Sequence, residues 1–257
     1  MTDIQRFKRL HVENTPLLLG NVWNVQSAKI YEKAGYKALA TSSSAVAESL
    51  GYDDGENMSF EEYFHIIKRI TESVSIPLTV DLEGGYGNTP DEITTNISRL
   101  VSIGVVGVNI EDSVVKNGVR RMLDKGKTYD KLKAVTERLR ANKINIFLNI
   151  RTDAFLLGLE NPLQETCERI RLFENLGVDG VFVPCVTSEN DIETLVNLTT
   201  LPINVMGIPG LPGFEILKNL GVKRISSGNF VNSYIYRCLE ITAVKVVADQ
   251  NFSTLFI

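Results

Sequence analysis

Residues 89–112 read TPDEITTNISRLVSIGVVGVNIED, and this stretch contains one complete unit of the fold. Thr89 and Glu92 have the spacing of a capping box, in which a hydroxyl and a carboxylate satisfy free backbone N–H groups at a helix start. Pro90 falls at the first helical position, and Gly104 stands where the helix needs a left-handed residue to end. The mostly apolar run Gly107–Glu111 then predicts a strand that is buried on both faces.

The same order of helix, glycine and strand repeats along the chain, which indicates a series of βα modules. Further helix starts are predicted at Ser59–Glu62, Asn161-Pro162 and Ser188, and further helix ends at Gly35, Gly177 and Gly221. Eight strands are predicted, at Pro16–Trp23, Ala38–Ser43, Pro77–Glu83, Gly107–Glu111, Ile146–Asp153, Gly180–Pro184, Pro202–Met206 and Arg224–Gly228. Eight such units in 257 residues suit an α/β fold of the (β/α)8 TIM barrel type, in a single domain over residues 1–257. An open doubly wound sheet is disfavoured, because no Gly-rich phosphate loop follows the first strand.

Composition excludes several classes of protein. The chain has 31 Asp and Glu against 27 Lys and Arg, a formal net charge of −4, and no clustered basic block, which disfavours a nucleic-acid partner. Cys167, Cys185 and Cys238 have no C-x-x-C spacing, so neither a disulfide framework nor a structural zinc site is expected. Residues 1–14 lack the apolar stretch of a signal peptide, and no run of ~20 apolar residues predicts a membrane span. We therefore expect a cytoplasmic protein without a membrane partner.

Acidic residues gather at the C-terminal ends of neighbouring strands, where barrels of this kind carry their active sites. Asp81 and Glu83 are two residues apart, which on a strand places both side chains on one face, and Glu111 is expected at the same level next to them. Three carboxylates without a histidine predict a site for a hard cation, Mg²⁺ or Mn²⁺. His11 and His65 lie outside every predicted strand end, which disfavours zinc.

Other strand ends supply candidates for substrate binding. The planar guanidinium of Arg151 matches a carboxylate, although an ion pair with the acidic residues is the alternative. Ser42, Ser43 and Ser44 would present N–H groups to an anion or, alternatively, cap a helix. Trp23 is a candidate for the wall of the site. No lysine lies at a strand end, which disfavours a Schiff-base aldolase, and no Ser-His-Asp arrangement is present.

Taken in order, these residues resemble the isocitrate lyase and phosphoenolpyruvate mutase superfamily over almost the whole chain. Residues 80–87, VDLEGGYG, are similar to the metal segment of that family, D-x-D/E-x-G-Y/F-G. Residues 109–112, NIED, and 149–154, NIRTDA, are similar to its I-E-D and A-R-T-D-A strands. Asp112 is interpreted as a hydrogen-bond anchor. The resemblance implies a helix-swapped barrel that assembles as a homodimer or homotetramer.

The resemblance also implies a role for each residue. Asp81 would bind Mg²⁺ directly, Glu83 and Glu111 would act mainly through metal waters, and Asp54, with Asp53 as its alternative, would be a further acid near the metal. The substrate would be bound by Ser42, Ser43, Ser44, Arg151 and Asn204, with Trp23 beside it. Catalysis would then fall to Arg151, Ser42 and Glu111.

One segment departs from the family pattern. Residues 113–126, SVVKNGVRRMLDKG, contain neither the Cys nor the His of the gating loop in isocitrate and methylisocitrate lyases. Lys116, Asn117 and Arg120 remain candidates for closing over a substrate anion. The expected activity is a Mg²⁺-dependent lyase that cleaves or decarboxylates a small 2-oxo or 2-hydroxy dicarboxylic acid through a pyruvate-like enolate. The alternatives are C–P chemistry on phosphonopyruvate and a non-catalytic barrel that binds a metabolite with a metal.

Overall fold

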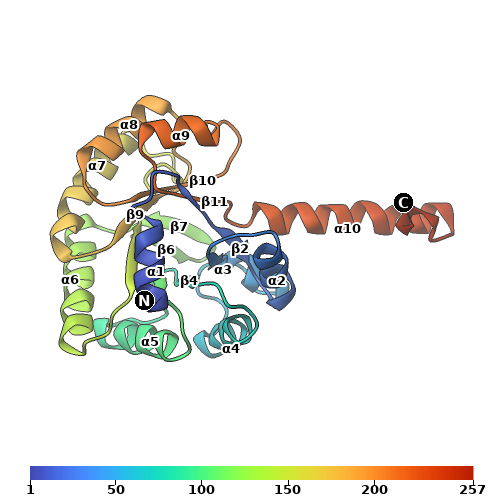
Figure 1. Ribbon diagram of the computed structural model, residues 1–257, viewed down its shortest axis with the longest axis horizontal. Helices are drawn as coiled ribbons and strands as arrows, with labels where there is room; N and C mark the ends of the chain where they lie inside the picture. Colours follow the sequence, from blue (N-terminus) through green and yellow to red (C-terminus); the bar gives the residue numbers. More distant parts are fainter. Residues whose placement is uncertain (257) are drawn as a thin grey trace.

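The computed structural model describes residues 1–256, and the predicted domain extends one residue further, to Ile257, which lies outside them. Within this range nine parallel strands form one sheet in the order β1-β11-β10-β9-β8-β5-β4-β3-β2. The sheet curls into a nearly closed barrel surrounded by helices (Figure 1). The predicted α/β barrel is therefore confirmed. The strands are β1 (Leu17–Leu18), β2 (Gly20–Val22), β3 (Leu39–Thr41), β4 (Leu78–Asp81), β5 (Gly107–Glu111), β8 (Phe147–Arg151), β9 (Gly180–Val183), β10 (Ile203–Met206) and β11 (Arg224–Ser226).

The first predicted strand is divided at Leu19, and this division closes the barrel. The Leu19 N–H donates to the Ile225 carbonyl at 2.9 Å, whereas the Gly20 N–H donates to the Ala38 carbonyl at 3.4 Å. The chain thus changes partner at this point, from β11 on one side to β3 on the other. The single strand predicted at Pro16–Trp23 is therefore two short strands, β1 and β2.

Helices follow the strands as the start signals predicted. Ser59 and Thr89 each accept a hydrogen bond from the backbone three residues on and form complete capping boxes with Glu62 and Glu92. Asn161 precedes a helix but makes no side-chain cap. The helices are α1 (Asp3–Leu10), α2 (Val25–Lys33), α3 (Ser43–Ser49), α4 (Phe60–Thr71), α5 (Pro90–Ser102), α6 (Lys125–Ala141), α7 (Pro162–Phe173), α8 (Glu189–Leu198), α9 (Phe214–Leu220) and α10 (Phe230–Asp249), with short 3₁₀ turns at Glu174–Leu176 and Ser253–Leu255.

Helix α1 covers the N-terminal end of the barrel. Its Phe7 and Leu10 are buried against Leu17 and Phe147 at the beginnings of the strands. His11, at the end of the helix, stacks on Phe147 with 4.2 Å between ring centroids. With that end closed by apolar packing, a ligand can reach the interior only from the opposite end.

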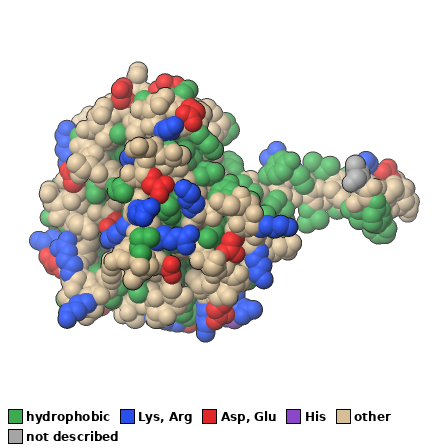
Figure 2. Space-filling model, in the orientation of Figure 1, with side chains coloured by type: hydrophobic (Ala, Val, Ile, Leu, Met, Phe, Trp, Pro, Cys, Tyr) green, Lys and Arg blue, Asp and Glu red, His purple; other side chains and the backbone are tan. Residues whose placement is uncertain are grey.

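Helix α10 contacts the barrel near its start, where Val231 packs against the core, and then extends away from it as an arm (Figure 1). Apolar side chains cover much of this arm (Figure 2), and those of Tyr234, Leu239, Val244 and Val247 are each at least 59% exposed. No helix within residues 1–256 combines the length and apolar character needed to cross a bilayer. The exposed surface therefore calls for another explanation, since apolar patches of this kind commonly mark interaction sites.

Candidate active site

A cavity of about 280 Å³ lies at the C-terminal ends of the strands. The sequence predicted the active site at this end of the barrel. The lining of the cavity includes six of the predicted site residues, the loop candidate Arg120 and several residues that were not predicted. The six are Ser42, Ser43, Ser44, Asp54, Asp81 and Arg151; the unpredicted ones include Asn21, Asn109, Arg224, Ser226 and Asn229.

Asp81 is the last residue of β4, and it is fixed from two sides. Ser43 Oγ donates to Asp81 Oδ2 at 3.0 Å, and the Tyr63 hydroxyl donates to the Asp81 carbonyl at 2.9 Å. The Asp81 N–H donates to Thr41 Oγ1 at 3.0 Å. Asp81 Oδ1 is buried without a hydrogen-bond partner. The carboxylate is thus rigidly held with one oxygen free.

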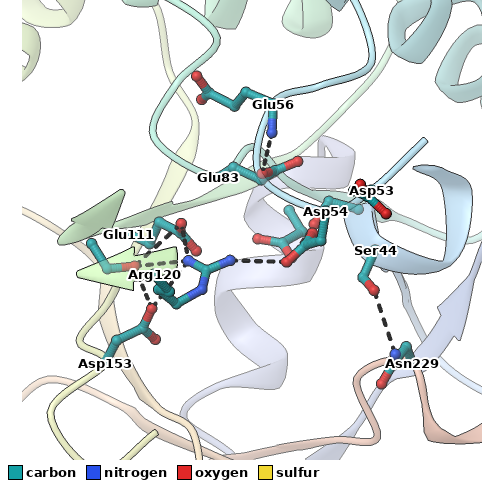
Figure 3. A network of polar contacts seen from close by, with 12 residues as sticks. Ser44, Asp53, Asp54, Glu56, Glu83, Glu111, Arg120, Asp153 and Asn229 are labelled. Atoms are coloured by element: carbon teal, nitrogen blue, oxygen red, sulfur yellow. Dashed lines mark hydrogen bonds and ion pairs between the residues drawn. The ribbon is translucent and has the colours of Figure 1, made fainter. Parts of the chain in front are cut away.

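Asp54, rather than Asp53, is the acid of the preceding loop that lines the cavity. Asp53 is exposed, while Asp54 Oδ2 pairs with Arg120 and Asp54 Oδ1 is buried without a partner. The two neighbours point differently in Figure 3, where only Asp54 is joined to the central guanidinium. The geometry therefore separates the two alternatives that the sequence left open.

The expected position of Glu83 relative to Asp81 was wrong. Strand β4 ends at Asp81, and Glu83 has a φ of +50°, so strand alternation no longer decides where its side chain points. Its Oε2 accepts from the Glu56 N–H at 2.8 Å (Figure 3). Its Oε1 accepts from the Tyr86 hydroxyl at 2.9 Å. Both oxygens of Glu83 are thus committed to neighbours, and its side chain is 2% exposed.

Glu111 lies beside Glu83 on the neighbouring strand, since its N–H donates to the Glu83 carbonyl at 2.8 Å, but it does not lie at the level of Asp81. The register of the parallel strands pairs Asp81 with Asn109, so Glu111 lies two residues further along β5 and pairs with Arg151 of β8. Tilted barrel strands are staggered in this way, and the stagger cannot be read from strand ends alone. Glu111 Oε2 lies 3.2 Å from Arg151 Nη1, and Glu111 Oε1 accepts a short hydrogen bond from Arg120.

Arg151 forms the ion pairs that the sequence allowed as an alternative to substrate binding. Its Nε donates to Asp153 Oδ1 at 2.6 Å, in addition to the contact with Glu111. It nevertheless lines the cavity, so a ligand can reach it. Asp112 is confirmed as an anchor, because its Oδ1 accepts from the Asp153 N–H at 3.0 Å and its Oδ2 pairs with Arg169 at 3.2 Å.

The segment that departs from the family pattern folds as a β-hairpin of β6 (Ser113–Lys116) and β7 (Val119–Met122). Asn117 and Gly118 form its turn with φ values of +53° and +71°, as a type I′ turn requires. Lys116 and Asn117 are exposed, whereas Arg120 points back into the site (Figure 3). The Asn-Gly pair was a signal for this hairpin that strand-end reasoning did not use.

Ser42 adopts the capping role that was the alternative for the serine turn. Its Oγ accepts from the Ala45 N–H at 3.3 Å and begins α3. Ser43 holds Asp81, and the Ser44 hydroxyl accepts from the Asn229 side-chain amide at 3.4 Å (Figure 3). The turn at Ser43 and Ser44 therefore connects Asp81 to the loop after β11.

Two predicted substrate residues lie outside the cavity lining. Trp23 is 6% exposed and packs in the core beside α2. Asn204 is 1% exposed, and its Nδ2 donates to the Val205 and Arg224 carbonyls, so the side chain stabilises the sheet. Residues that the strand-end rule missed include Arg224, because it begins its strand, and Arg120, because it lies on the hairpin.

Burial raises the pKa values of three acids in and around the cavity, Asp81, Glu83 and Glu111. Burial, and after it the charges of Asp54, Asp81 and Glu111, raises the pKa of Glu83 to about 8. Burial likewise raises the pKa of Glu111 to about 7, with Arg151 opposing the shift. Burial also raises the pKa of Asp81, against the effect of Arg151. A cation placed among these groups would reverse the cost of keeping them charged.

The residues present fit a divalent cation at Asp54 and Asp81. Each offers a buried carboxylate oxygen without a partner, and both line the cavity. Across residues 1–256 no cluster of three or more His, Cys, Asp or Glu side chains is arranged to hold a metal ion. Mg²⁺ often takes only one or two protein carboxylates and keeps several waters, so two hard oxygen donors suit it.

Comparisons with known proteins show the family of the chain. The family model for phosphoenolpyruvate phosphomutase matches residues 7–247. An uncharacterized protein of Mycobacterium tuberculosis is 30% identical over 87% of this chain and 81% of its own length. An oxaloacetate decarboxylase of a Bradyrhizobium species is 27% identical over 74% of this chain and 66% of its own length. A crystal structure of a phosphonomutase candidate from Burkholderia cenocepacia J2315 superposes with a TM-score of 0.87 at 34% identity, covering 95% of this chain and 99% of that one.

Proposed function

Because the chain belongs to the phosphoenolpyruvate phosphomutase family, we propose that it is a Mg²⁺-dependent lyase acting on a small 2-oxo or 2-hydroxy dicarboxylic acid. The reaction would break the bond to C3, by carbon–carbon cleavage or by decarboxylation. The observation that carries this proposal is that one cavity contains both free carboxylate oxygens, which can bind a cation, and hydrogen-bond donors, which can bind an anion. Asp54 and Asp81 present free carboxylate oxygens, and Arg151 and the serine turn present hydrogen-bond donors.

The residues of the chain would do three things to such a substrate. Arg151 would orient an anionic substrate, held in place by its own contacts with Glu111 and Asp153. In a 2-oxo acid, the terminal carboxylate leaves as CO2 when the C3–C4 bond breaks, and the electron pair of that bond passes through C3 to the oxo oxygen. There Arg151 and the donors of Ser43 and Ser44 would stabilise the negative charge of the enolate. Asp54 and Asp81 would hold Mg²⁺, with Glu83 and Glu111 acting through water. A bound Mg²⁺ would supply Lewis-acid polarisation of the substrate oxygens.

The test is Asp81→Ala, assayed for pyruvate release from oxaloacetate with Mg²⁺ after subtraction of the uncatalysed background. We expect turnover to fall at least ~100-fold while the circular dichroism spectrum is retained, since loss of this carboxylate would release the Mg²⁺ that stabilises the developing enolate. Asp53→Ala is the matched control, because Asp53 is an exposed neighbour of Asp54. Undiminished turnover in Asp81→Ala would refute the assignment of Asp81.

Carbon–phosphorus chemistry is the second candidate, and the structural likeness to a phosphonomutase candidate favours it. A phosphonyl group would need free cationic contacts from the β6–β7 hairpin. There Lys116 is exposed and Arg120 is already bound by Asp54, Glu111 and Asp153. We therefore rank C–C chemistry first. Phosphonopyruvate and oxaloacetate assayed side by side separate the two, and metal-dependent binding of oxalate without turnover of either would indicate a non-catalytic barrel.

We further propose that the partner of the arm is a second copy of this chain, in a helix-swapped homodimer or homotetramer. A groove of about 440 Å³ lies where α10 leaves the barrel, lined by apolar side chains that include Ile30, Ile235 and Leu239. In a swapped pair the arm of one copy would lie against α2 and this groove of the other. Both the exposed arm and the exposed groove would be buried by the same contact, as a two-fold interface requires.

A further inference from the structure

Arg224 is a buried cation at the floor of the cavity. It begins β11, pairs in register with Leu17 and Asn204, and is 1% exposed. It also lines the cavity, below the rim formed by Asp54 and Arg120 at the loops. Its side chain therefore faces the space in which a substrate would lie, although the protein around it excludes bulk water.

The hydrogen bonding of Arg224 is incomplete. Its Nη2 donates to Asn109 Oδ1 at 3.2 Å. Its Nε and Nη1 have no partner, and no acid among the described residues forms an ion pair with it. Leaving a guanidinium buried without an anion costs several kcal/mol in general, which is why buried arginines are normally paired.

The other two arginines of the cavity show the contrast. Arg120 contacts Asp54, Glu111 and Asp153, and Arg151 contacts Glu111 and Asp153. The lining thus holds three guanidinium groups, two of which the protein neutralises itself. Burial lowers the pKa of Arg224 to about 9, and only the charge of Asp81 opposes this shift. An anionic group of a ligand would neutralise the charge of Arg224 and accept hydrogen bonds from its Nε and Nη1.

We propose that Arg224 is a specificity-determining residue that binds a second carboxylate of the substrate at the floor of the cavity. This inference rests on the proposed function and deepens it, because it separates diacids from monoacids. One carboxylate and its neighbouring oxygen would lie at the rim, between the acids and Arg151. The other carboxylate would accept charge-assisted hydrogen bonds from Arg224. A monoacid would leave the guanidinium unpaired and bind less tightly.

The test compares (S)-malate with (S)-lactate, which differ by that second carboxylate and are not 2-oxo acids. Binding is measured by titration calorimetry with Mg²⁺ for the wild type, Arg224→Met and Arg224→Lys. We expect the wild type to bind malate at least tenfold more tightly than lactate. In Arg224→Met the affinity for malate falls at least tenfold while that for lactate is unchanged, and Arg224→Lys restores part of the preference because its ammonium keeps the charge.

The outcomes separate this inference from the proposed function. A wild type that binds malate no more tightly than lactate overturns the role of Arg224 even if both variants fail to fold. Equal losses for both acids in a folded Arg224→Met variant indicate a structural role only and also overturn it. A folded Arg224→Met variant that keeps the wild-type preference for malate overturns it as well. A wild-type preference for malate that Arg224→Met loses, without turnover of any 2-oxo acid by the wild type, would support Arg224 and refute the lyase.

Discussion

Arg120 Nη2 lies 2.9 Å from Asp54 Oδ2, and this ion pair joins the β6–β7 hairpin to the loop after α3. The same guanidinium contacts Glu111 through Nη1. The guanidinium of Arg120 therefore lies between Asp54 and Glu111, two of the acids that were predicted to bind a metal ion directly or through water. It holds these acids in place, and it fixes the hairpin over the cavity.

Replacement of Arg120 by Met should lower kcat/KM at least tenfold, which corresponds to about 1.4 kcal/mol of lost transition-state stabilisation. The physical reason is that the hairpin loses its anchor and Glu111 loses one of its two arginine partners, keeping Arg151. Hydrogen exchange of residues 113–122 should become faster. Arg121→Met is the control, because Arg121 is exposed on the same strand. Unchanged turnover and exchange in Arg120→Met would contradict the anchoring role.

Replacement of Tyr63 by Phe should lower the free energy of unfolding by about 1–2 kcal/mol. The Tyr63 hydroxyl lies 2.5 Å from Thr41 Oγ1 and donates to the Asp81 carbonyl, and the ring is fully buried. Removal of the hydroxyl leaves that carbonyl without this donor. Urea denaturation measures the change. Tyr52→Phe removes a hydroxyl that binds Glu62 on the surface and should cost less than 0.5 kcal/mol; equal losses in both variants would argue against the buried contact.

His11 should make stability depend on pH. Burial, and after it the charge of Arg224, lowers the pKa of His11 to about 3 from 6.5. The unfolded chain therefore binds a proton between these values that the folded chain does not, so stability is lost as the pH falls below about 6.5. The slope from one such group is up to ~1.4 kcal/mol per pH unit. Between pH 6.5 and 4, His11→Phe should show a shallower loss than the wild type, and the exposed His65→Gln should not. Parallel curves for all three proteins would contradict this.

The arm offers a test of assembly. Leu239→Glu combined with Val244→Glu places charges on exposed apolar positions of α10. If the arm is buried against a second copy, these charges should dissociate the oligomer to a monomer in light scattering, because buried unpaired charges are costly. Lys245→Glu, on an exposed polar position of the same helix, is the control. A monomeric wild type, or a double variant that keeps its oligomeric state, would refute the swapped assembly.

Much of the barrel was predictable because its strands are buried on both faces and read as apolar runs. Strand Gly107–Glu111 has the bounds that the sequence predicted, and the capping boxes at Ser59 and Thr89 formed as expected. Side-chain positions at the strand ends were less predictable. The left-handed backbone at Glu83 and the stagger between β4 and β5 depend on how the barrel closes, and no local pattern encodes closure.

The strand-end rule passed over two site residues for different reasons, although the loop sequence had already made Arg120 a candidate. Arg120 reaches the cavity from a hairpin, so its contribution depends on a turn at Asn117 and Gly118 rather than on a barrel strand. Arg224 begins its strand, and a rule that searches strand ends passes over it. Both side chains are long enough to act far from their own backbone, and sequence position alone does not show that reach.

The hairpin is closed at its base by a hydrogen bond of 2.9 Å from the Leu123 N–H to the Asp112 carbonyl. Between these two residues β6 and β7 pair with each other and with no barrel strand. The hairpin therefore contributes no strand to the barrel. A segment of different length or chemistry that begins at Asp112 and ends at Leu123 would leave the barrel sheet intact. Evolution can in this way exchange the groups above the cavity, and with them the reaction, without redesigning the barrel beneath.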